Sequence, residues 1–296
     1  MDVSYEETFR SVTLPDGTTV AYNEAGAGDR AVILVHGSGP GATGWSNFNP
    51  NIGALADDFH VYALDMPGWG ESSSRPAADY RHPEVVVQFM AAVGIDRAAL
   101  VGNSMGGMIA IAVAARHPER VSHLITMGPG SGGVTIFDAG GGLTEGLKIL
   151  YKGYADPSPE NFLATVDIMT YDTPQEVAAP LAEQRSANAR RHQEHLDNWL
   201  EGSVDGPPLR YGASEREIAS ITAPALLIHG RDDRVVPFEH TLRLVRLISD
   251  SRAYLINRCG HWAQLEHAEE FNRLVRDFVL NTSGTGEKPA LVALGG

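Results

Sequence analysis

The 296-residue chain contains a single cysteine, so it can form no internal disulfide and offers no thiolate cluster for a metal. It also lacks any run of about 20 apolar residues, the length that a membrane-spanning helix needs. Its first ten residues, MDVSYEETFR, are acidic and lack the basic and apolar regions of a secretion signal. These absences predict a cytoplasmic protein that has no membrane partner and is stabilised by packing.

Basic residues are scarce relative to acidic ones, with 23 Lys and Arg against 37 Asp and Glu, which gives a formal net charge of -14 at pH 7. A surface of this sign repels phosphate groups, so nucleic acid is excluded as a partner class. Hydrophobic residues make up 43% of the chain and aromatic residues 7%, as in an ordinary globular protein with a sizeable core. One sheet flanked by helices can use this length without splitting into two domains.

Apolar runs alternate with helical patterns along most of the chain. Five short, continuously apolar runs have the character of strands covered on both faces: 31–35, 61–64, 98–101, 124–126 and 225–228. Helical spacing of apolar residues is found in three segments: 83–93, 105–116 and 239–248. This alternation predicts an α/β fold with a mostly parallel sheet and right-handed crossovers.

Three further strands complete a predicted sheet of eight. Two alternating segments, 9–14 and 19–23, flank a Pro-Asp-Gly turn and predict a hairpin of edge strands. A last strand is predicted over 253–256, ahead of a helix over 269–279.

The alternation stops between residues 131 and 211. There the Gly-rich segments GPGSGG and DAGGGL give way to the charged, helical sequence EQRSANARRHQEHLDNWL. We interpret 131–211 as a helical lid inserted between two halves of the core, 1–130 and 212–281. The last residues, 282–296, begin with small, polar and Gly-rich sequence and are expected to form a flexible tail.

One pentapeptide has the context of an activated serine nucleophile. Gly102-Asn103-Ser104-Met105-Gly106 lies directly after the apolar run AALV and directly before the helical run MGGMIAIAVAAR. So sharp a turn strains the serine backbone, and side chains at the flanking glycines would collide. The amide groups that begin the following helix stabilise negative charge near the serine. The pattern predicts Ser104 as a nucleophile; the alternative is an ordinary turn in which Ser104 caps the helix.

A serine hydroxyl needs a neighbouring base, and an imidazole can take and return a proton at neutral pH. His261 lies in the segment CGHW, between the predicted strand 253–256 and the predicted helix 269–279. This position puts it on a loop at the far end of the sheet, so we predict that His261 is the base. Several other histidines lie on polar, helical stretches and are expected to be solvated: His117, His192, His195 and His240.

The base needs an orienting carboxylate, and the segment HGRDDRVVP after the apolar run ALLI offers two. The pattern Gly-x-x-Asp, common at this loop in α/β-hydrolases, selects Asp233 and leaves Asp232 as a loop or surface residue. The resulting chain order, Ser, Asp, His, is the order of the α/β-hydrolase fold and differs from those of other serine hydrolases.

A second Gly-rich loop, HGSGPG, follows the apolar run AVILV and lets backbone amides approach a ligand closely. In the α/β-hydrolase fold, one oxyanion donor is the amide after the nucleophile, here Met105, and another comes from this loop, here Ser38 or Gly39. The alternative is a simple turn at the end of a strand. We expect His36 to have a structural role.

Five segments together closely resemble the meta-cleavage product hydrolases: HGSGPGATGWSNF, DMPGWGESS, LVGNSMGG, GRDDRVVP and CGHWAQLEHAEEFN. The resemblance spans nearly the whole core. It implies an α/β-hydrolase fold and a serine enzyme that cleaves a carbon-carbon bond in 2-hydroxy-6-oxo-hexa-2,4-dienoate compounds formed during bacterial degradation of aromatics. It further implies a keto tautomer and an acyl-enzyme as intermediates, no cofactor, and assembly into a homo-oligomer.

The resemblance also assigns the residues that surround the carboxylate and enol oxygen of the substrate. They are Asn47, Asn103, Arg185 and Trp262. Arg190 and Arg191 compete with Arg185 for the role in the lid. The family often has glycine where this chain has Ser38, a departure that concerns one oxyanion donor.

Two other functions remain open. A carboxylesterase or lactonase would use the same machinery on an easier bond, and a non-catalytic ligand receptor could retain the fold and its pocket. Haloalkane dehalogenases and epoxide hydrolases are disfavoured, because those relatives carry aspartate where this chain has Ser104. The substituent at the distal end of the substrate is not predicted.

Overall fold

The computed structural model describes residues 1–131, 143–202 and 212–283. Eight strands form one sheet in the order β1-β2-β4-β3-β5-β6-β7-β8. Their bounds are β1 (Phe9–Thr13), β2 (Thr19–Ala25), β3 (Ala31–Val35), β4 (His60–Leu64), β5 (Ala98–Asn103), β6 (Val121–Met127), β7 (Ala225–Gly230) and β8 (Ser251–Ile256). Pairing is antiparallel from β1 through β2 to β4 and parallel elsewhere. The predicted α/β fold with a mostly parallel, eight-stranded sheet is confirmed.

Strand positions agree with the sequence patterns to within a few residues, with one error of placement. The hairpin of β1 and β2 exists, but of its two strands β1 alone lies at an edge of the sheet. Strand β2 also pairs with β4, from Tyr22↔Leu64 to Ala25↔Val61. Four consecutive buried residues in β2, from Val20 to Asn23, reflect this interior position.

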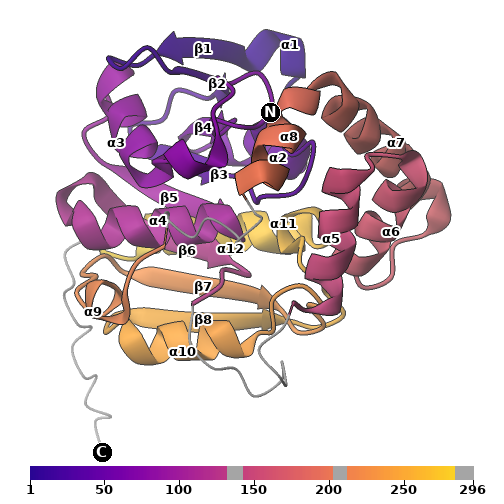
Figure 1. The fold of residues 1–296 in the computed structure, drawn as a ribbon. Helices are drawn as coiled ribbons and strands as arrows, with labels where there is room; N and C mark the ends of the chain where they lie inside the picture. The colour runs from indigo at the N-terminus through magenta and orange to yellow at the C-terminus, as the bar shows by residue number, and fades with distance from the viewer. Residues whose placement is uncertain (132–142, 203–211, 284–296) are drawn as a thin grey trace, which may run out of the picture.

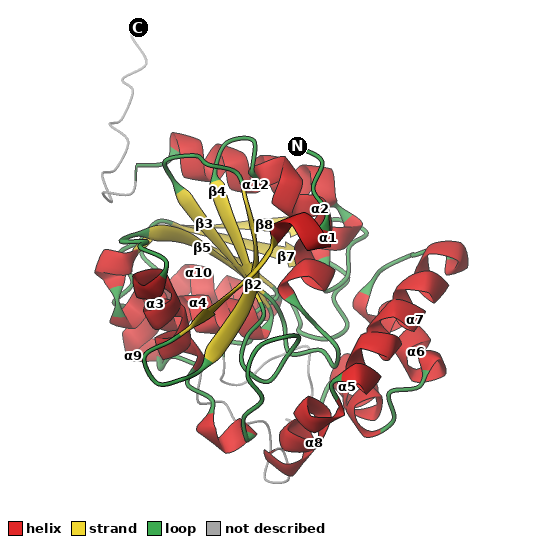
Figure 2. Cartoon of the chain, turned by 90° about the horizontal axis from the view of Figure 1, so that it is seen from above, coloured by secondary structure: helices red, strands yellow, loops and turns green. Residues whose placement is uncertain are grey.

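The helices of the core cover both faces of the sheet. They are α1 (Tyr5–Thr8), α2 (Gly44–Leu55), α3 (His82–Ala92), α4 (Met105–Arg116), α9 (Glu215–Ile218), α10 (Glu239–Leu247), α11 (Ala263–Glu266) and α12 (Ala268–Asn281), with 3-10 turns η1 (Ala77–Asp79) and η2 (Pro118–Arg120). Figure 2 shows α2 and α12 on one face of the sheet and α3, α4 and α10 on the other. None of the helices that the structure describes is long and apolar enough to cross a bilayer.

Successive side chains of the central strands enter two separate cores. Along β3, Ile33 and Val35 pack in the cluster that also contains residues of α3, α4 and α10. Val32 and Leu34 pack in the opposite cluster, with residues of α2 and α12. Because side chains of a strand alternate between faces, a strand covered on both sides must be apolar at every position, which explains the continuous runs in the sequence.

Parallel pairing brings the loops that follow the strands to one edge of the sheet. At this edge Val35 of β3 pairs with Gly102 of β5, and Asn103 of β5 pairs with Met127 of β6. Strand β7 pairs in parallel with β6 on one side and with β8 on the other. Loops far apart in the sequence therefore meet where ligands bind in open α/β sheets.

Four helices between β6 and β7 stand apart from the core layers. They are α5 (Glu145–Ala155), α6 (Pro159–Met169), α7 (Gln175–Arg191) and α8 (Gln193–Gly202). Figures 1 and 2 show them grouped at one side of the sheet. The segment DAGGGL and the end of the predicted lid fall largely or wholly within 132–142 and 203–211, outside the described residues, as does nearly all of the predicted tail 282–296.

Candidate active site

Ser104 occupies a strained turn between β5 and α4. Its φ of 54° and ψ of -116° lie outside the regions that residues with a Cβ normally adopt. A Cβ on Gly102 would collide with the backbone of Gly106, and one on Gly106 would collide with that of Val35. The Ser104 side chain makes no capping hydrogen bond to α4. The turn therefore has the geometry of a nucleophile elbow, in which the serine does not serve as a helix cap.

The loops after β7 and β8 bring the predicted acid and base together. Nδ1 of His261 lies 2.7 Å from Oδ2 of Asp233, and the two side chains are 2% and 0% exposed. The side chain of the neighbouring Asp232 is partly exposed, and its Oδ2 accepts a hydrogen bond from the Arg258 amide at 3.1 Å. Because a carboxylate accepts, Nδ1 of His261 carries the proton, which leaves Nε2 as the basic nitrogen.

The Asp233 carboxylate stays ionised although its side chain is buried. Burial acts to raise the pKa of Asp233, but the charges and hydrogen bonds of His261 and His229 outweigh it and hold the pKa below its usual value. Its other oxygen, Oδ1, accepts hydrogen bonds from the amides of Val235 at 2.7 Å and Val236 at 2.9 Å. A negative charge fixed in this way favours the imidazolium form of the base during proton transfer.

Three contacts join the nucleophile turn to this pair. The Ser104 amide donates to the carbonyl of Met127 at 2.8 Å, and Asn103 Nδ2 donates to the carbonyl of His261 at 3.2 Å. Gly128, which follows Met127, packs so closely that an added Cβ would lie 2.9 Å from His261 Nδ1. The serine, histidine and aspartate loops therefore form one packed junction at the edge of the sheet.

The histidines outside this junction do not all behave as predicted. His117 and His192 are partly exposed, with side chains 36% and 16% accessible, but His195 is only 9% exposed and packs edge-on to His192, so the expectation of solvation is wrong for His195. His240 is partly buried, and its Nδ1 accepts a hydrogen bond from the Ser131 amide at 3.1 Å. The reason is that α8 and α10 turn these positions toward the protein interior.

His36 holds the Gly-rich loop after β3. Its Nε2 accepts from the Met66 amide at 3.0 Å, so Nδ1 carries the proton and donates to the carbonyl of Gly37 at 2.7 Å. Burial lowers the pKa of His36 to about 4, which keeps the ring neutral at pH 7. In a trans peptide the next N–H points away from such a carbonyl, so this bond sets the direction of the Ser38 amide.

Two aromatic side chains hold the next carbonyls of the same loop. The hydroxyl of Tyr154, from helix α5, donates to the carbonyl of Ser38. Nε1 of Trp69 donates to the carbonyl of Gly39 at 3.1 Å. With three successive carbonyls bound by side chains, the intervening amides have fixed directions before any ligand arrives. Fixed amide donors near a nucleophile are what an oxyanion site requires.

A buried polar cluster lies beside the nucleophile turn. The guanidinium of Arg185 is 2% exposed and donates to Asn47 Oδ1 at 3.3 Å and to the carbonyl of Ser46 at 3.0 Å. Nδ2 of Asn47 donates to Oδ1 of Asn103 at 3.4 Å, and the Arg185 guanidinium lies 4.2 Å from the centre of the Trp262 ring. The structure thus brings together the four residues predicted to surround the substrate carboxylate and enol oxygen.

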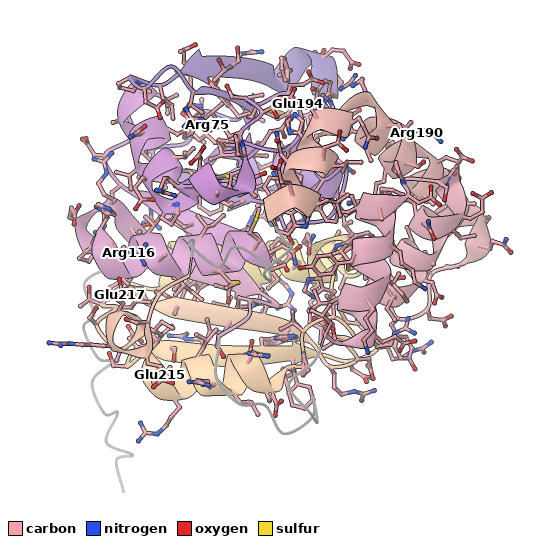
Figure 3. The ribbon with its side chains drawn as sticks, viewed as in Figure 1. Arg75, Arg116, Arg190, Glu194, Glu215 and Glu217 are labelled. Carbon is pink, nitrogen blue, oxygen red and sulfur yellow. The ribbon has the colours of Figure 1, made fainter. Side chains whose placement is uncertain are left out.

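Arg185 carries an uncompensated charge inside the protein. Burial lowers its pKa to about 10, so it remains protonated at pH 7, and its Nε has no hydrogen-bond partner among the described residues. The competing arginines are exposed on the same helix: Arg190 points outward in Figure 3, and Arg191 pairs with Glu71. A buried cation with an unused donor is expected to bind an anion.

A cavity of about 230 Å³ opens at Ser104, lined by residues of the core and of helices α5 and α8. Its lining is mainly apolar and contains none of Asp, Glu, Lys or Arg among the described residues. The lining residues are Ser38, Ser104, Met105, Met108, Gly130, Leu143, Thr144, Leu147, Leu150, Tyr151, Tyr154, Trp199, Val235, Val236, Pro237 and His240. Ser104 therefore lies near both a polar cluster and an apolar cavity, which suits a substrate with one charged and one uncharged end.

The end of helix α6 supports the loop that carries His261. The amide of His261 donates to the carbonyl of Met169, the last residue of α6, at 2.7 Å. Glu266 joins the same segments, since its carboxylate accepts from the amides of Gly260 at 2.8 Å and Tyr171 at 2.7 Å. The position of the base therefore depends on α6 and the residues after it as well as on the core.

Three supporting residues had no recognisable signal in the sequence. Tyr154 lies on α5 and Glu266 ends the short helix α11, and their contacts with the Ser38 carbonyl and the Tyr171 amide join residues far apart in the sequence. His229 ends an apolar strand, and its contact with Asp233 depends on how the following loop turns back.

Comparison with known proteins was consistent across sequence and structure. The chain matches the model of the alpha/beta hydrolase fold family over residues 30–268. A 2-hydroxy-6-oxononadienedioate/2-hydroxy-6-oxononatrienedioate hydrolase of Burkholderia vietnamiensis is 42% identical over 270 residues, which are 89% of this chain and 92% of that protein. A 2-hydroxy-6-oxo-6-phenylhexa-2,4-dienoate hydrolase of Comamonas testosteroni is 42% identical over 264 residues, 88% of this chain and 91% of that protein.

Among solved structures, the meta-cleavage product hydrolase CumD from Pseudomonas fluorescens IP01, as a serine-to-alanine mutant complexed with acetates, has a TM-score of 0.80 to this chain. The two are 34% identical, and the match covers 92% of this chain and 98% of CumD.

Replacing Tyr154 with Phe tests the support of the Gly-rich loop. Loss of the bond to the Ser38 carbonyl frees the neighbouring amides, so we expect kcat for a p-nitrophenyl ester to fall about 10-fold. Tyr80→Phe is the matched control, because the Tyr80 hydroxyl is buried without a partner among the described residues and should leave kcat unchanged. Equal kcat for Tyr154→Phe and the wild type would show that the loop is held by other contacts.

Proposed function

The chain belongs to the meta-cleavage product hydrolases of the α/β-hydrolase fold, and we propose that it hydrolyses a carbon-carbon bond in 2-hydroxy-6-oxo-hexa-2,4-dienoate compounds from aromatic degradation. The observation that carries this proposal is the buried Arg185 with its partners Asn47, Asn103 and Trp262. Cleavage of a simple ester needs no such cation. A dienoate substrate supplies a carboxylate for it to bind.

The substrate would lie across Ser104 with its dienoate end in the polar cluster. Arg185 binds the carboxylate through its unused donor, while Asn47 and Asn103 lie within reach of the C2 oxygen. The positive charge of Arg185 also stabilises the negative charge that develops on that oxygen. This environment promotes transfer of a proton from the C2 hydroxyl to C5, which produces the keto tautomer.

Ketonisation makes the carbon-carbon bond breakable. In the keto form the C2 carbonyl is conjugated with a C3–C4 double bond, so the electrons of the C5–C6 bond can flow into an enolate when that bond breaks. Without this sink they would remain on one carbon, which is a poor leaving group. The product from this end is a 2-hydroxypenta-2,4-dienoate.

The triad would carry out the cleavage in two steps. Nε2 of His261 takes the proton from Ser104 as Oγ bonds to the C6 carbonyl, and the amides of Met105 and of Ser38 or Gly39 bind the resulting oxyanion. Collapse breaks the C5–C6 bond, leaves an acyl group on Ser104 and releases the dienolate, whose C2 oxygen takes the proton from His261. Water activated by His261 then releases a carboxylic acid and restores the serine. Asp233 keeps the imidazole oriented throughout.

Several expectations from the sequence are part of the same proposal. Residues 131–211 would form the lid, and the enzyme would act in the cytoplasm, without a cofactor, as a homo-oligomer. Helices α5–α8 support the assignment of the lid, because α5, α6 and α7 each hydrogen-bond to the site, through Tyr154, Met169 and Arg185 respectively.

Two other functions make distinguishable predictions. A carboxylesterase or lactonase would turn over short esters and leave the absorbance of a dienolate unchanged. A non-catalytic receptor would bind a dienoate without cleaving it. The buried Arg185 disfavours the first, and the strained Ser104 beside an oriented imidazole disfavours the second.

The Arg185→Gln variant tests the role of the buried cation. Because a charged pair with the carboxylate is lost, kcat/KM for a dienoate substrate should fall at least about 100-fold, or about 3 kcal/mol. Turnover of a neutral p-nitrophenyl ester should change far less. Arg190→Gln, on the exposed side of the same helix, is the control and should match the wild type. A parallel loss on both substrates would indicate a structural role for Arg185 instead.

The cavity beside Ser104 predicts the distal end of the substrate. Its described lining offers no cation, and burying an unpaired carboxylate costs several kcal/mol. We therefore expect kcat/KM for the 6-phenyl dienoate to exceed that for the nonadienedioate by at least about 10-fold. Both rates are measured from the decay of dienolate absorbance. A preference for the dicarboxylate would contradict an uncharged distal site, while cleavage of the carbon-carbon bond would still stand.

A further inference from the structure

A second imidazole contacts the acid of the triad. His229, near the end of β7, is 0% exposed, and its Nε2 lies 3.1 Å from Oδ2 of Asp233. This is the same oxygen that receives Nδ1 of His261. The same Nε2 lies 2.8 Å from the carbonyl of Val236, and Nδ1 lies 2.8 Å from the hydroxyl of Thr241 on α10.

These contacts decide which nitrogen of His229 carries the proton. A carboxylate and a carbonyl can only accept, so Nε2, which faces both, must be the donor. Nδ1 then has a lone pair, and the Thr241 hydroxyl donates to it. A chain of donors thus runs from Thr241 through His229 to Asp233, and burial excludes water that could replace it.

We propose that His229 is a positioning residue for the hydrolysis, which fixes the Asp233 carboxylate through its Nε2–H and, through that carboxylate, sets the orientation and basicity of His261. Without this donor, Oδ2 would have His261 as its one partner, and the carboxylate would be held less tightly at that oxygen. With it, both oxygens are bound, Oδ1 by two backbone amides and Oδ2 by two imidazoles.

The shared oxygen also explains how His229 tunes the base. Because Oδ2 accepts from two donors, its negative charge stabilises each imidazole less than it would stabilise a single one. The other titratable groups around Asp233 are Cys259 and Glu266, and burial is the main cause that raises the pKa of each. Neither donates a hydrogen bond to Oδ2 in the described structure, so the second donor to this oxygen is His229.

Two substitutions separate positioning from simple filling of space. His229→Leu removes the donor, and His229→Gln keeps an N–H near the position of Nε2. For dienoate cleavage by the full-length enzyme, we expect kcat of the Leu variant to fall about 10-fold, with KM within about twofold. The acidic limb of its kcat/KM profile should move upward, because Oδ2 then stabilises the imidazolium of His261 alone. The Gln variant should recover most of the activity and the original limb.

His123→Leu is the control for loss of a buried imidazole, since His123 bonds only to Ser122 and Thr282 in the described structure. It should leave kcat and the pH profile unchanged even where it lowers the melting temperature. If the Leu and Gln variants of His229 lose equal activity, or if the Leu variant keeps the wild-type profile, His229 is not a positioning residue.

An NMR measurement on the unmutated enzyme covers the case in which His229→Leu fails to fold. Long-range nitrogen-proton spectra at neutral pH should show His229 protonated at Nε2. Protonation at Nδ1 would overturn the proposal, because Nε2 could then donate nothing to Asp233. Since the proposal rests on the triad, Asp233→Asn is measured in parallel. An active Asp233→Asn variant would refute the triad itself. If Asp233→Asn is inactive while His229→Leu behaves like the wild type, only the role of His229 is refuted.

Discussion

The hydrogen bond between His261 Nδ1 and Asp233 Oδ2, at 2.7 Å and with both side chains almost wholly buried, determines what the rest of the site can do. It fixes the tautomer of the imidazole and leaves Nε2 as the basic nitrogen. Water cannot compete for the carboxylate, so the bond keeps its strength while charge moves during the reaction. The parallel pairing of β5 to β8 makes this contact possible, because it brings the loops of all three residues to one edge.

The inserted helices take part in the site and do more than cover it. Helix α5 supplies the hydroxyl that holds the Ser38 carbonyl, α6 the carbonyl that receives the His261 amide, and α7 the buried Arg185. Because these helices hold the base and the oxyanion loop, the geometry of the catalytic groups depends on how the helices pack against the core.

Local patterns were sufficient to predict much of the fold and the identity of the site residues. Buried parallel strands must be apolar throughout, so β3, β5 and β7 stand out in the sequence, and the glycines around Ser104 are required by contacts with the backbone. Helix α2 was missed, because Pro50 and Gly53 disfavour a helix that the Thr43 capping box and buried apolar side chains stabilise. The support from Tyr154 and His229 was not predictable, since it arises only when distant segments pack.

The central claim is that Ser104 becomes covalently acylated while a carbon-carbon bond breaks. Rapid quenching of the enzyme with a 6-phenyl dienoate, followed by mass spectrometry of the peptide that contains Ser104, tests it most directly. We predict that this peptide carries a benzoyl group within the first turnover and that Ser104→Ala carries none. Release of the pentadienoate product at full rate, with Ser104 unmodified at every time point, would contradict nucleophilic catalysis by this serine.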